Sequence, residues 1–343
     1  MKERVPAHKL PATAEGTALM TRRLLLTCGF FVAALTALAA PAAKAQEWPA
    51  KGPIKIIVPF SAGSATDIIA RTVFNQVGEQ IKQTFVVENR GGAGTTLGAG
   101  MVARADADGY TLLVNSTSQV VVASTYAHLP YSVADDFAGI SELADIPFVV
   151  ATSTKYNTLA DLIAAGKKPG SHILYGTAGA GSSGQLFMEH LRLAAGFPAT
   201  HVPFRGTPEG MNEVIAGRID LYPAPVLNTL PLAKAGKVHL LAISSTKRLA
   251  LIPDVPTLAE EGLPKALYNF WIGAFAPAKT PKPIVERLNK EVTIALKRKD
   301  IADKIRNLGG EPTPMTADAF DTFVRKEIAT NAEIVKASGY KPQ

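Results

Sequence analysis

The sequence has very little cysteine, since its 343 residues contain only Cys28. A single cysteine cannot form an internal disulfide, nor supply a Cys-rich zinc or iron–sulfur site, which excludes small disulfide-stabilised scaffolds and both metal classes. Aromatic residues make up only 7% and charged residues 19% of the chain, whereas 47% are apolar. Such a composition is typical of packed globular proteins and not of disordered ones.

Residues 1–45 have the pattern of an upstream extension followed by a secretory signal peptide. Arg22-Arg23 precedes an apolar run over 24–40, and the small-x-small sequence Ala43-Lys44-Ala45 follows it. This order predicts export with cleavage after Ala45. An uncleaved anchor is the alternative, because a run of about 17 residues is near the minimum for a membrane span. The start at Met1 or Met20, and the export route, stay open.

The basic charge of the chain lies mostly in this leader. The whole sequence has a formal net charge of +7, but residues 46–343 carry 30 Lys or Arg against 27 Asp or Glu, a net charge of +3. No Lys/Arg stripe remains that would indicate nucleic-acid binding. No later segment reaches 18 continuous apolar residues. We therefore expect a soluble periplasmic protein with no nucleic-acid partner.

Strand and helix patterns alternate along the rest of the chain. The β-branched run over 54–60 predicts a strand, and Ile69, Val73, Val77 and Ile81 recur at the spacing of one helix face. The same order returns after the apolar segment 173–175. Such alternation predicts an α/β fold with mostly parallel sheets and helices on both faces. Two blocks in 298 residues predict two domains with a ligand cleft between them.

The first candidate binding loop joins a strand to a helix at Pro59-Phe60-Ser61-Ala62-Gly63-Ser64-Ala65-Thr66-Asp67. Gly63 allows a tight turn, the hydroxyls of Ser61, Ser64 and Thr66 are donors, and the free N–H groups of a helix start favour an anion. The alternative is an ordinary helix cap, in which Ser64 or Thr66 satisfies the helix and Asp67 complements its dipole.

The second candidate loop runs from Gly176 to Gly184 and contains a literal G-x-G-x-x-G at Gly179, Gly181 and Gly184. A dinucleotide site needs an acidic residue at the end of the next strand, but here that strand ends in Phe204-Arg205. We therefore favour a second anion-binding loop of backbone N–H groups, and we expect no cofactor. Two such loops facing one cleft would hold a small anion.

Other constellations do not predict catalysis or metal binding. The chain has no G-x-S-x-G motif, no Walker lysine motif and no H-E-x-x-H motif. Ser182 and Ser183 are conceivable nucleophiles, but the sequence ties no base to them. We therefore predict neither an enzyme nor a metal protein. A periplasmic hydrolase or isomerase on the same fold is kept as a minor alternative.

These motifs, taken together, resemble the tripartite tricarboxylate transporter substrate-binding family, the Bug or TctC-like periplasmic solute receptors. The resemblance rests on the order and spacing of many short motifs along nearly the whole mature chain. They include Ile57-Val58-Pro59-Phe60 with Gly63, Thr66 and Asp67; Val87-Glu88-Asn89-Arg90; Asp108-Gly109-Tyr110-Thr111; Leu129-Pro130-Tyr131; Tyr175-Gly176 with Gly179 and Gly181; His201-Val202-Pro203-Phe204; Pro253-Asp254-Val255-Pro256; and Trp271 with Gly273, Ala276 and Pro277.

The resemblance implies a two-domain, type II periplasmic-binding-protein fold that closes like a clamp on a small carboxylate. It places domain 1 at residues 46–148 plus 269–343 and domain 2 at 149–268, and the carboxylate between the two candidate loops. We expect the end of the third strand to contribute as well. The predicted ligand-binding residues are Phe60, Ser61, Ala62, Gly63, Ser64, Thr66, Asp67, Ser116, Thr117, Thr177, Ala178, Gly179, Gly181, Ser182, Ser183, Ala224, Pro225 and Val226.

One departure from the family pattern bears on the ligand. Many members carry Asp at the position of Ala224, where it could pair with a ligand amine. Ala224, Pro225 and Val226 would form an apolar wall instead, which favours a carboxylate with an apolar or aromatic body over an amino acid. The resemblance further implies delivery to membrane permease subunits. A sensor that serves a two-component kinase without transport is the alternative, and we expect a monomer.

Overall fold

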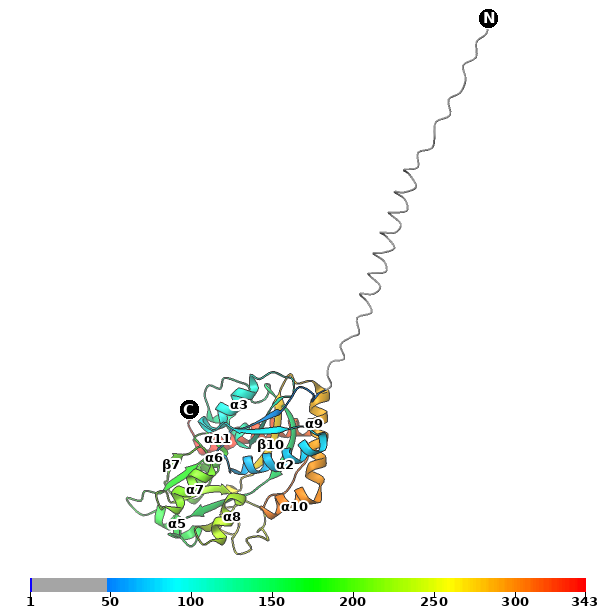
Figure 1. The fold of residues 1–343 in the computed structure, drawn as a ribbon. Coiled ribbons are helices and arrows are strands. Elements are labelled where there is room, and N and C mark those ends of the chain that lie inside the picture. Colours follow the sequence, from blue (N-terminus) through cyan, green and yellow to red (C-terminus); the bar gives the residue numbers. More distant parts are fainter. Residues whose placement is uncertain (2–47) are drawn as a thin grey trace. The chain divides into compact units, whose positions relative to one another are not determined.

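The computed structural model describes Met1 and residues 48–343 (Figure 1). Residues 48–343 form one unit, which contains all of the strands and helices named below. The predicted signal peptide and its cleavage site lie outside the described residues. None of the described helices is long and apolar enough to cross a membrane.

The first of two five-stranded sheets has the strand order β2-β1-β3-β10-β4. β1 lies parallel to β2 and to β3, whereas β10 lies antiparallel to both β3 and β4. All seven residues of β10 are buried, as expected for a strand with a neighbour on each side. The strands are β1 (Ile54–Val58), β2 (Phe85–Asn89), β3 (Thr111–Ser116), β4 (Phe137–Asp145) and β10 (Trp271–Pro277).

The second sheet has the order β7-β6-β8-β5-β9. β6 lies parallel to β7 and β8, and β5 lies antiparallel to β8 and β9. All residues of β5 are buried. The strands are β5 (Phe148–Thr152), β6 (Leu174–Thr177), β7 (Thr200–Pro203), β8 (Leu221–Pro225) and β9 (His239–Ile243).

In each sheet four of the five strands run in the same direction and one is reversed, which agrees with the prediction of mostly parallel sheets. The reversed strand is β10 in the first sheet and β5 in the second. The chain enters each of these strands from the other sheet, and each runs antiparallel to its neighbours. β4 leads into β5 through Ile146 and Pro147 alone, and the chain returns from β9 to β10. We call these two connections between the sheets the crossings. They lie side by side, because Ile146 N donates a hydrogen bond to Phe270 O at 2.9 Å. The prediction of an α/β fold with two sheet-centred parts is confirmed.

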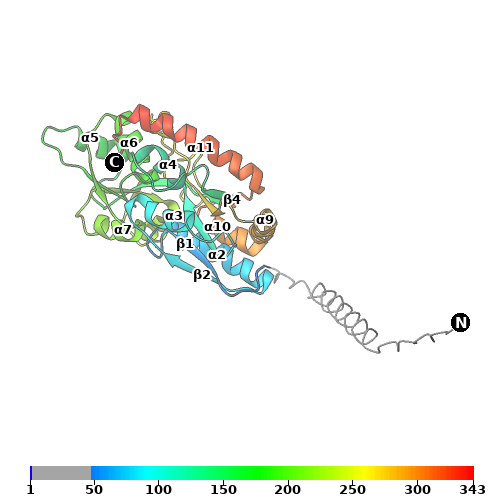
Figure 2. The same ribbon diagram turned by 90° about the horizontal axis from the view of Figure 1, so that it is seen from above.

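Helices cover the faces of both sheets (Figures 1 and 2). α2, α3, α9 and α11 pack on the first sheet, and α6, α7 and α8 pack on the second. Figure 2 shows the C-terminal α11 alongside α4, and α11 also contacts α6. The helices are α2 (Ala65–Ile81), α3 (Thr96–Ala103), α4 (Ser118–Thr125), α5 (Leu159–Gly166), α6 (Ser183–Ala195), α7 (Thr207–Ile215), α8 (Val226–Lys234), α9 (Lys282–Lys297), α10 (Lys299–Asn307) and α11 (Ala317–Ser338), with short 3-10 turns at Ala93–Thr95 and Pro264–Ala266.

We call β1–β4, β10 and the helices α2–α4 and α9–α11 the first half, and β5–β9 with α5–α8 the second half. The domain boundaries expected from the sequence, near residues 148 and 268, fall at the two crossings and are kept as a proposal.

Candidate functional site

The loop between β1 and α2 ends in a capped helix start. Ser64 has extended backbone angles, and its Oγ accepts a hydrogen bond from Asp67 N at 3.3 Å. This is the ordinary N-cap that the sequence allowed for Ser64. Within the described chain, the N–H groups of Ala65 and Thr66 donate to no protein acceptor. The start of α2 therefore keeps two free donors at its positive end.

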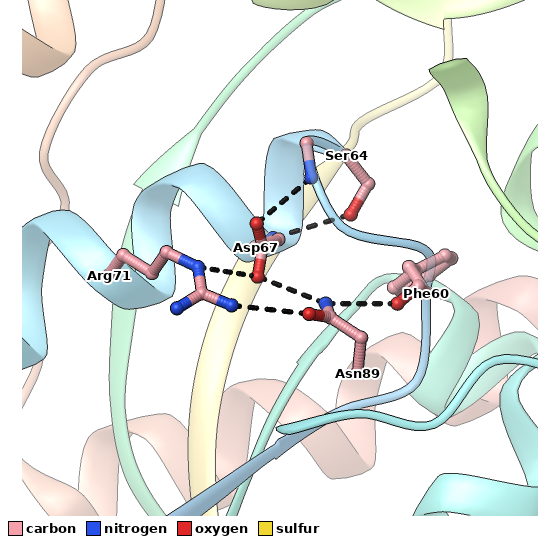
Figure 3. A network of polar contacts seen from close by, with 6 residues as sticks. Phe60, Ser64, Asp67, Arg71 and Asn89 are labelled. Carbon is pink, nitrogen blue, oxygen red and sulfur yellow. Dashed lines mark hydrogen bonds and ion pairs between the residues drawn. The ribbon is translucent and has the colours of Figure 1, made fainter. Parts of the chain in front are cut away.

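Asp67 holds this loop in place (Figure 3). Its carboxylate accepts hydrogen bonds from Gly63 N at 2.9 Å, from Arg71 Nε at 3.0 Å and from Asn89 Nδ2 at 3.0 Å. Asn89 Nδ2 also donates to Phe60 O at 3.1 Å, which fixes the end of β1. The carboxylate thus ties the loop, α2 and β2 together.

The negative charge of Asp67 is compensated by hydrogen-bond donors within this network. Burial alone would raise the pKa of Asp67, but hydrogen bonds from Arg71, from the Gly63 N–H and from Asn89 outweigh it, so its pKa lies below the usual value. Arg71, the nearby cation, is paired with this carboxylate. Neither charge is therefore free for a ligand, and Asp67 acts by positioning the loop.

The second loop lies between β6 and α6, with Ser182 at the N-cap position. The Ser182 Oγ donates to Gly179 O at 2.6 Å, and the Thr177 Oγ1 donates to the same carbonyl at 3.0 Å. The first N–H of the helix, that of Ser183, donates to Ser118 Oγ of the first half at 3.1 Å. The N–H of Gly184 has no protein acceptor within the described chain, so it remains a free donor.

The glycines of this loop serve close approach between the two halves. A Cβ on Gly181 would lie 2.6 Å from a ring carbon of Tyr126. On the facing turn of the first half, a Cβ on Gly94 would lie 2.1 Å from Ala180 O of this loop. Gly179 and Gly181 also have positive φ angles of 120° and 74°. The G-x-G-x-x-G spacing is thereby explained without a dinucleotide, because its first two glycines face protein.

Several hydrogen bonds join the halves directly around these loops. Thr125 Oγ1 donates to Gly181 O and Tyr126 OH donates to Ala180 O, both at 3.0 Å. The hydroxyls of Ser118 and Ser183 lie 3.0 Å apart. On the other loop, Ser61 N donates to Arg205 O at 3.2 Å. The structure is therefore closed at the junction of the two halves.

A small cavity lies between the N-termini of α2 and α6. Its volume is about 20 Å³, room for about one water molecule. Side chains from both halves form it, and none of them is charged. The lining residues are Phe60, Ser64, Ala65, Thr66, Ser118, Phe148, Ala178, Ser182, Ser183, Gly184, Thr207, Tyr222, Pro223, Pro225 and Phe270.

The cavity has a polar end and an apolar wall. The polar end combines the two helix N-termini with the hydroxyls of serine and threonine side chains. The rings of Phe148 and Phe270 form part of the wall, with centroids 4.5 Å apart. Pro223 and Pro225, on one face of β8, complete it. Such a site offers neutral hydrogen-bond donors to the anionic group of a ligand and an apolar surface to the rest of that ligand.

The structure brings seven of the predicted residues to this cavity: Phe60, Ser64, Thr66, Ala178, Ser182, Ser183 and Pro225. The others are not among the residues that line it. Thr117 Oγ1 accepts from Trp271 N at 2.9 Å and so anchors β10. Ala224 packs in an apolar cluster with Met211 and Val214 and is not among the residues that line the cavity. Those that do not line the cavity are Ser61, Ala62, Gly63, Asp67, Ser116, Thr117, Thr177, Gly179, Gly181, Ala224 and Val226.

Of the three residues expected to form the apolar wall only Pro225 lines the cavity, and the rest of the wall comes from other residues. Phe148 and Phe270 sit at the two crossings between the sheets, a place that only the three-dimensional arrangement reveals. Tyr222 and Pro223 directly precede the predicted segment on β8, and Thr207 begins α7. Gly206-Thr207-Pro208 has the sequence pattern of a helix start that carries a hydroxyl. This pattern could have predicted from the sequence that Thr207 lies at a helix N-terminus.

The described part of the chain shows no activated nucleophile at the cavity. Ser182 Oγ contacts a carbonyl and a threonine hydroxyl, and Ser183 Oγ contacts Ser118 Oγ. His201 Nε2 lies 2.6 Å from Thr177 Oγ1, and burial lowers its pKa to about 4, so the ring stays neutral. No group of three His, Cys, Asp or Glu among the described residues is placed to hold a metal.

A larger cavity, of about 900 Å³, lies near the crossings and is lined among others by Asp145, Leu267, Tyr268, Arg306 and Glu311. It contains charges of both signs, and Arg306 pairs with Glu311 at 2.8 Å. The helix N-termini of α2 and α6 do not reach it. We therefore place the candidate binding site at the smaller cavity.

Comparison with known proteins agrees with this geometry. The family model described as the tripartite tricarboxylate transporter family receptor matches residues 69–340. The chain belongs to this family. The protein BugT of Bordetella pertussis is 33% identical to it over 325 residues, which cover 93% of this chain and 98% of BugT.

Two solved structures of proteins from Rhodopseudomonas palustris are similar to this one. Rpa4515 with adipate has a TM-score of 0.83 and 29% identity, and the match covers 87% of this chain and 100% of that one. MatC with bound malate has a TM-score of 0.79 and 29% identity, covering 83% and 99%. The chain is thus a solute-binding receptor of the tripartite tricarboxylate transporter type with the two-domain α/β fold, as the resemblance implies.

Proposed function

We propose that this receptor captures a small carboxylate in the cavity between its two halves and delivers it to a tripartite tricarboxylate permease from the periplasm. One observation carries the proposal: the N-termini of α2 and α6 meet at a cavity that no charged side chain lines. Helix N-termini favour anions through their free N–H groups and their dipoles. The relatives that bind adipate and malate support a carboxylate as the anion.

The apolar wall supports a ligand with an apolar or aromatic body. Phe60, Phe148, Phe270 and two prolines surround the polar end, and no carboxylate is among the lining residues to pair with an amine. Amino acids are therefore disfavoured. Tight binding of aspartate or glutamate would overturn this part of the proposal.

The halves must separate before a ligand enters, because the closed cavity has room for about one water molecule. The hydrogen bonds that Thr125 and Tyr126 make to the second loop would break on opening and re-form on closure. A hinge at the two crossings, near Ile146 and Phe270, fits this motion.

Calorimetric titration of two matched variants tests the binding site. Ala178 lines the cavity and is half-buried, so Ala178→Asp adds a negative charge there and Ala178→Asn adds a neutral group of the same size. Two like charges about 4 Å apart repel by about 4 kcal/mol at an effective dielectric constant of 20. We expect Ala178→Asp to weaken adipate binding at least about 100-fold and Ala178→Asn less than about 10-fold. Equal losses would contradict an anion at this place.

Uptake measurements test delivery. Cells that lack this chain should lose uptake of the bound carboxylate if the receptor serves a permease. Unchanged uptake, with loss of ligand-dependent gene expression, would favour the sensor alternative. We further propose that the processed protein, residues 46–343, works as a monomer.

A further inference from the structure

The ring of Tyr222 on β8 fills a space that is free because two neighbouring residues are glycines. A Cβ on Gly176 of β6 would lie 2.8 Å from a ring carbon of Tyr222, and one on Gly210 of α7 would lie 2.1 Å from another. Any larger residue at either position would collide with the ring. The ring is therefore held between β6 and α7, and its direction is fixed by packing.

The hydroxyl of Tyr222 lacks a hydrogen-bond partner of good geometry within the described chain, although the residue is only 1% exposed. Burial raises the pKa of Tyr222 above its usual value, and the nearby Thr207 hydroxyl offsets this only in part, so the phenol stays protonated and can donate. Buried hydroxyls normally find a partner, and one without a protein partner calls for an explanation. Tyr222 is among the residues that line the cavity at the helix N-termini, and a ligand bound there would supply the missing acceptor.

Thr207 stands at the same cavity. It is the first residue of α7 and is 5% exposed. Its hydroxyl and the phenol of Tyr222 come from the second half, whereas Ser64 and Thr66 come from the first. The residues that line the cavity thus include hydroxyl-bearing side chains beyond those of the two helix starts proposed to hold the carboxylate.

We propose that Tyr222, assisted by Thr207, is a specificity residue that donates a hydrogen bond to a second oxygen of the ligand, so that the receptor selects carboxylates bearing a further hydroxyl, carbonyl or carboxyl group. This inference rests on the carboxylate-binding function proposed above. It names the ligand class more narrowly: an apolar body, one carboxylate at the helix N-termini, and one further acceptor.

Calorimetric titration with matched ligand pairs tests the inference on the purified processed protein. The pairs are adipate with hexanoate, and 4-hydroxybenzoate with benzoate, which differ only in the second polar group. We expect the parent protein to prefer the member with the second oxygen. Tyr222→Phe should weaken that member about 10-fold or more and leave its partner within about 2-fold, because one hydrogen bond is lost. Thr207→Val should act in the same direction.

A control variant separates this effect from a general loss. Tyr110→Phe removes the phenol that accepts from Lys51 N at 2.8 Å, and Tyr110 does not line the cavity. It should leave all four affinities unchanged. The midpoint of thermal unfolding without ligand should not fall in Tyr222→Phe, because no well-formed protein hydrogen bond is removed.

Three results would overturn the inference. Equal weakening of both members of a pair would place the phenol at the carboxylate, and no weakening of either would make it a structural residue. A lower unfolding midpoint for unliganded Tyr222→Phe would indicate a protein partner for the hydroxyl. If the parent protein binds none of the four acids, the proposed function itself fails, and that outcome differs from all three.

Discussion

Replacing Asp67 tests the claim that this residue organises the first loop. Asp67→Asn keeps the size of the side chain but puts an amide donor where three donors now converge, from Gly63, Arg71 and Asn89. Hydrogen bonds to a charged group contribute about 1.5–3 kcal/mol each, and the Arg71 side chain is 45% exposed, which weakens its share. We expect a loss of about 2–4 kcal/mol in the free energy of unfolding.

Urea unfolding followed by circular dichroism measures this loss, with Asp106→Asn as the matched control on an exposed carboxylate. The pKa of Asp67 is lowered in the folded state, so its contribution is present above its unfolded-state pKa and is lost as pH falls through the folded value. The difference between parent and variant should therefore shrink in acid. A variant as stable as the parent at pH 7, with unchanged adipate affinity, would refute the role given to Asp67.

Three further predictions concern the closure contacts and the buried charge. Tyr126→Phe removes the hydrogen bond to Ala180 O, so closure loses about 1 kcal/mol and small-angle scattering without ligand should show a larger radius of gyration; an unchanged radius would refute the contact. Gly181→Ala should weaken adipate binding, because its Cβ would lie 2.6 Å from Tyr126, whereas Gly170→Ala, at a φ of 73° with open space around it, should not; equal affinities would refute the close approach. Burial raises the pKa of Glu142 to about 7, so its ionisation destabilises the fold as pH rises from about 4.5 through 7. Glu142→Gln should therefore be up to about 3 kcal/mol more stable than the parent in urea unfolding at pH 8 but not at pH 4, and a constant difference would refute this.

The sequence predicted the two strand-to-helix loops at the cavity because their signals are local. A helix cap such as Ser64 or Ser182 and a glycine turn such as Gly179 to Gly181 are specified by adjacent residues. The extended strand before each loop and the helix after it were predicted for the same reason. Six residues of the cavity followed from these two loops alone, and Pro225 of β8 was the seventh.

The remaining lining residues depend on long-range packing. Phe148 and Phe270 meet because two distant crossings lie side by side, and neither segment signals this by itself. Ala224 was expected in the wall, but its short side chain lies on the other face of β8 from Pro223 and Pro225. Tyr222 shares the face of Ala224, and its longer side chain still reaches the cavity. The single reversed strand of each sheet, β10 or β5, was not predicted either, since strand partners are chosen at long range.

Titration of the processed protein with acid and amide pairs tests most directly whether helix N-termini hold a carboxylate here. Adipate is compared with adipamide, and benzoate with benzamide, which have nearly the same shape but no charge. The proposal predicts that each carboxylate binds at least about 100-fold more tightly than its amide, because an amide N–H₂ opposes the N–H donors of α2 and α6. Equal affinity of acid and amide would contradict it.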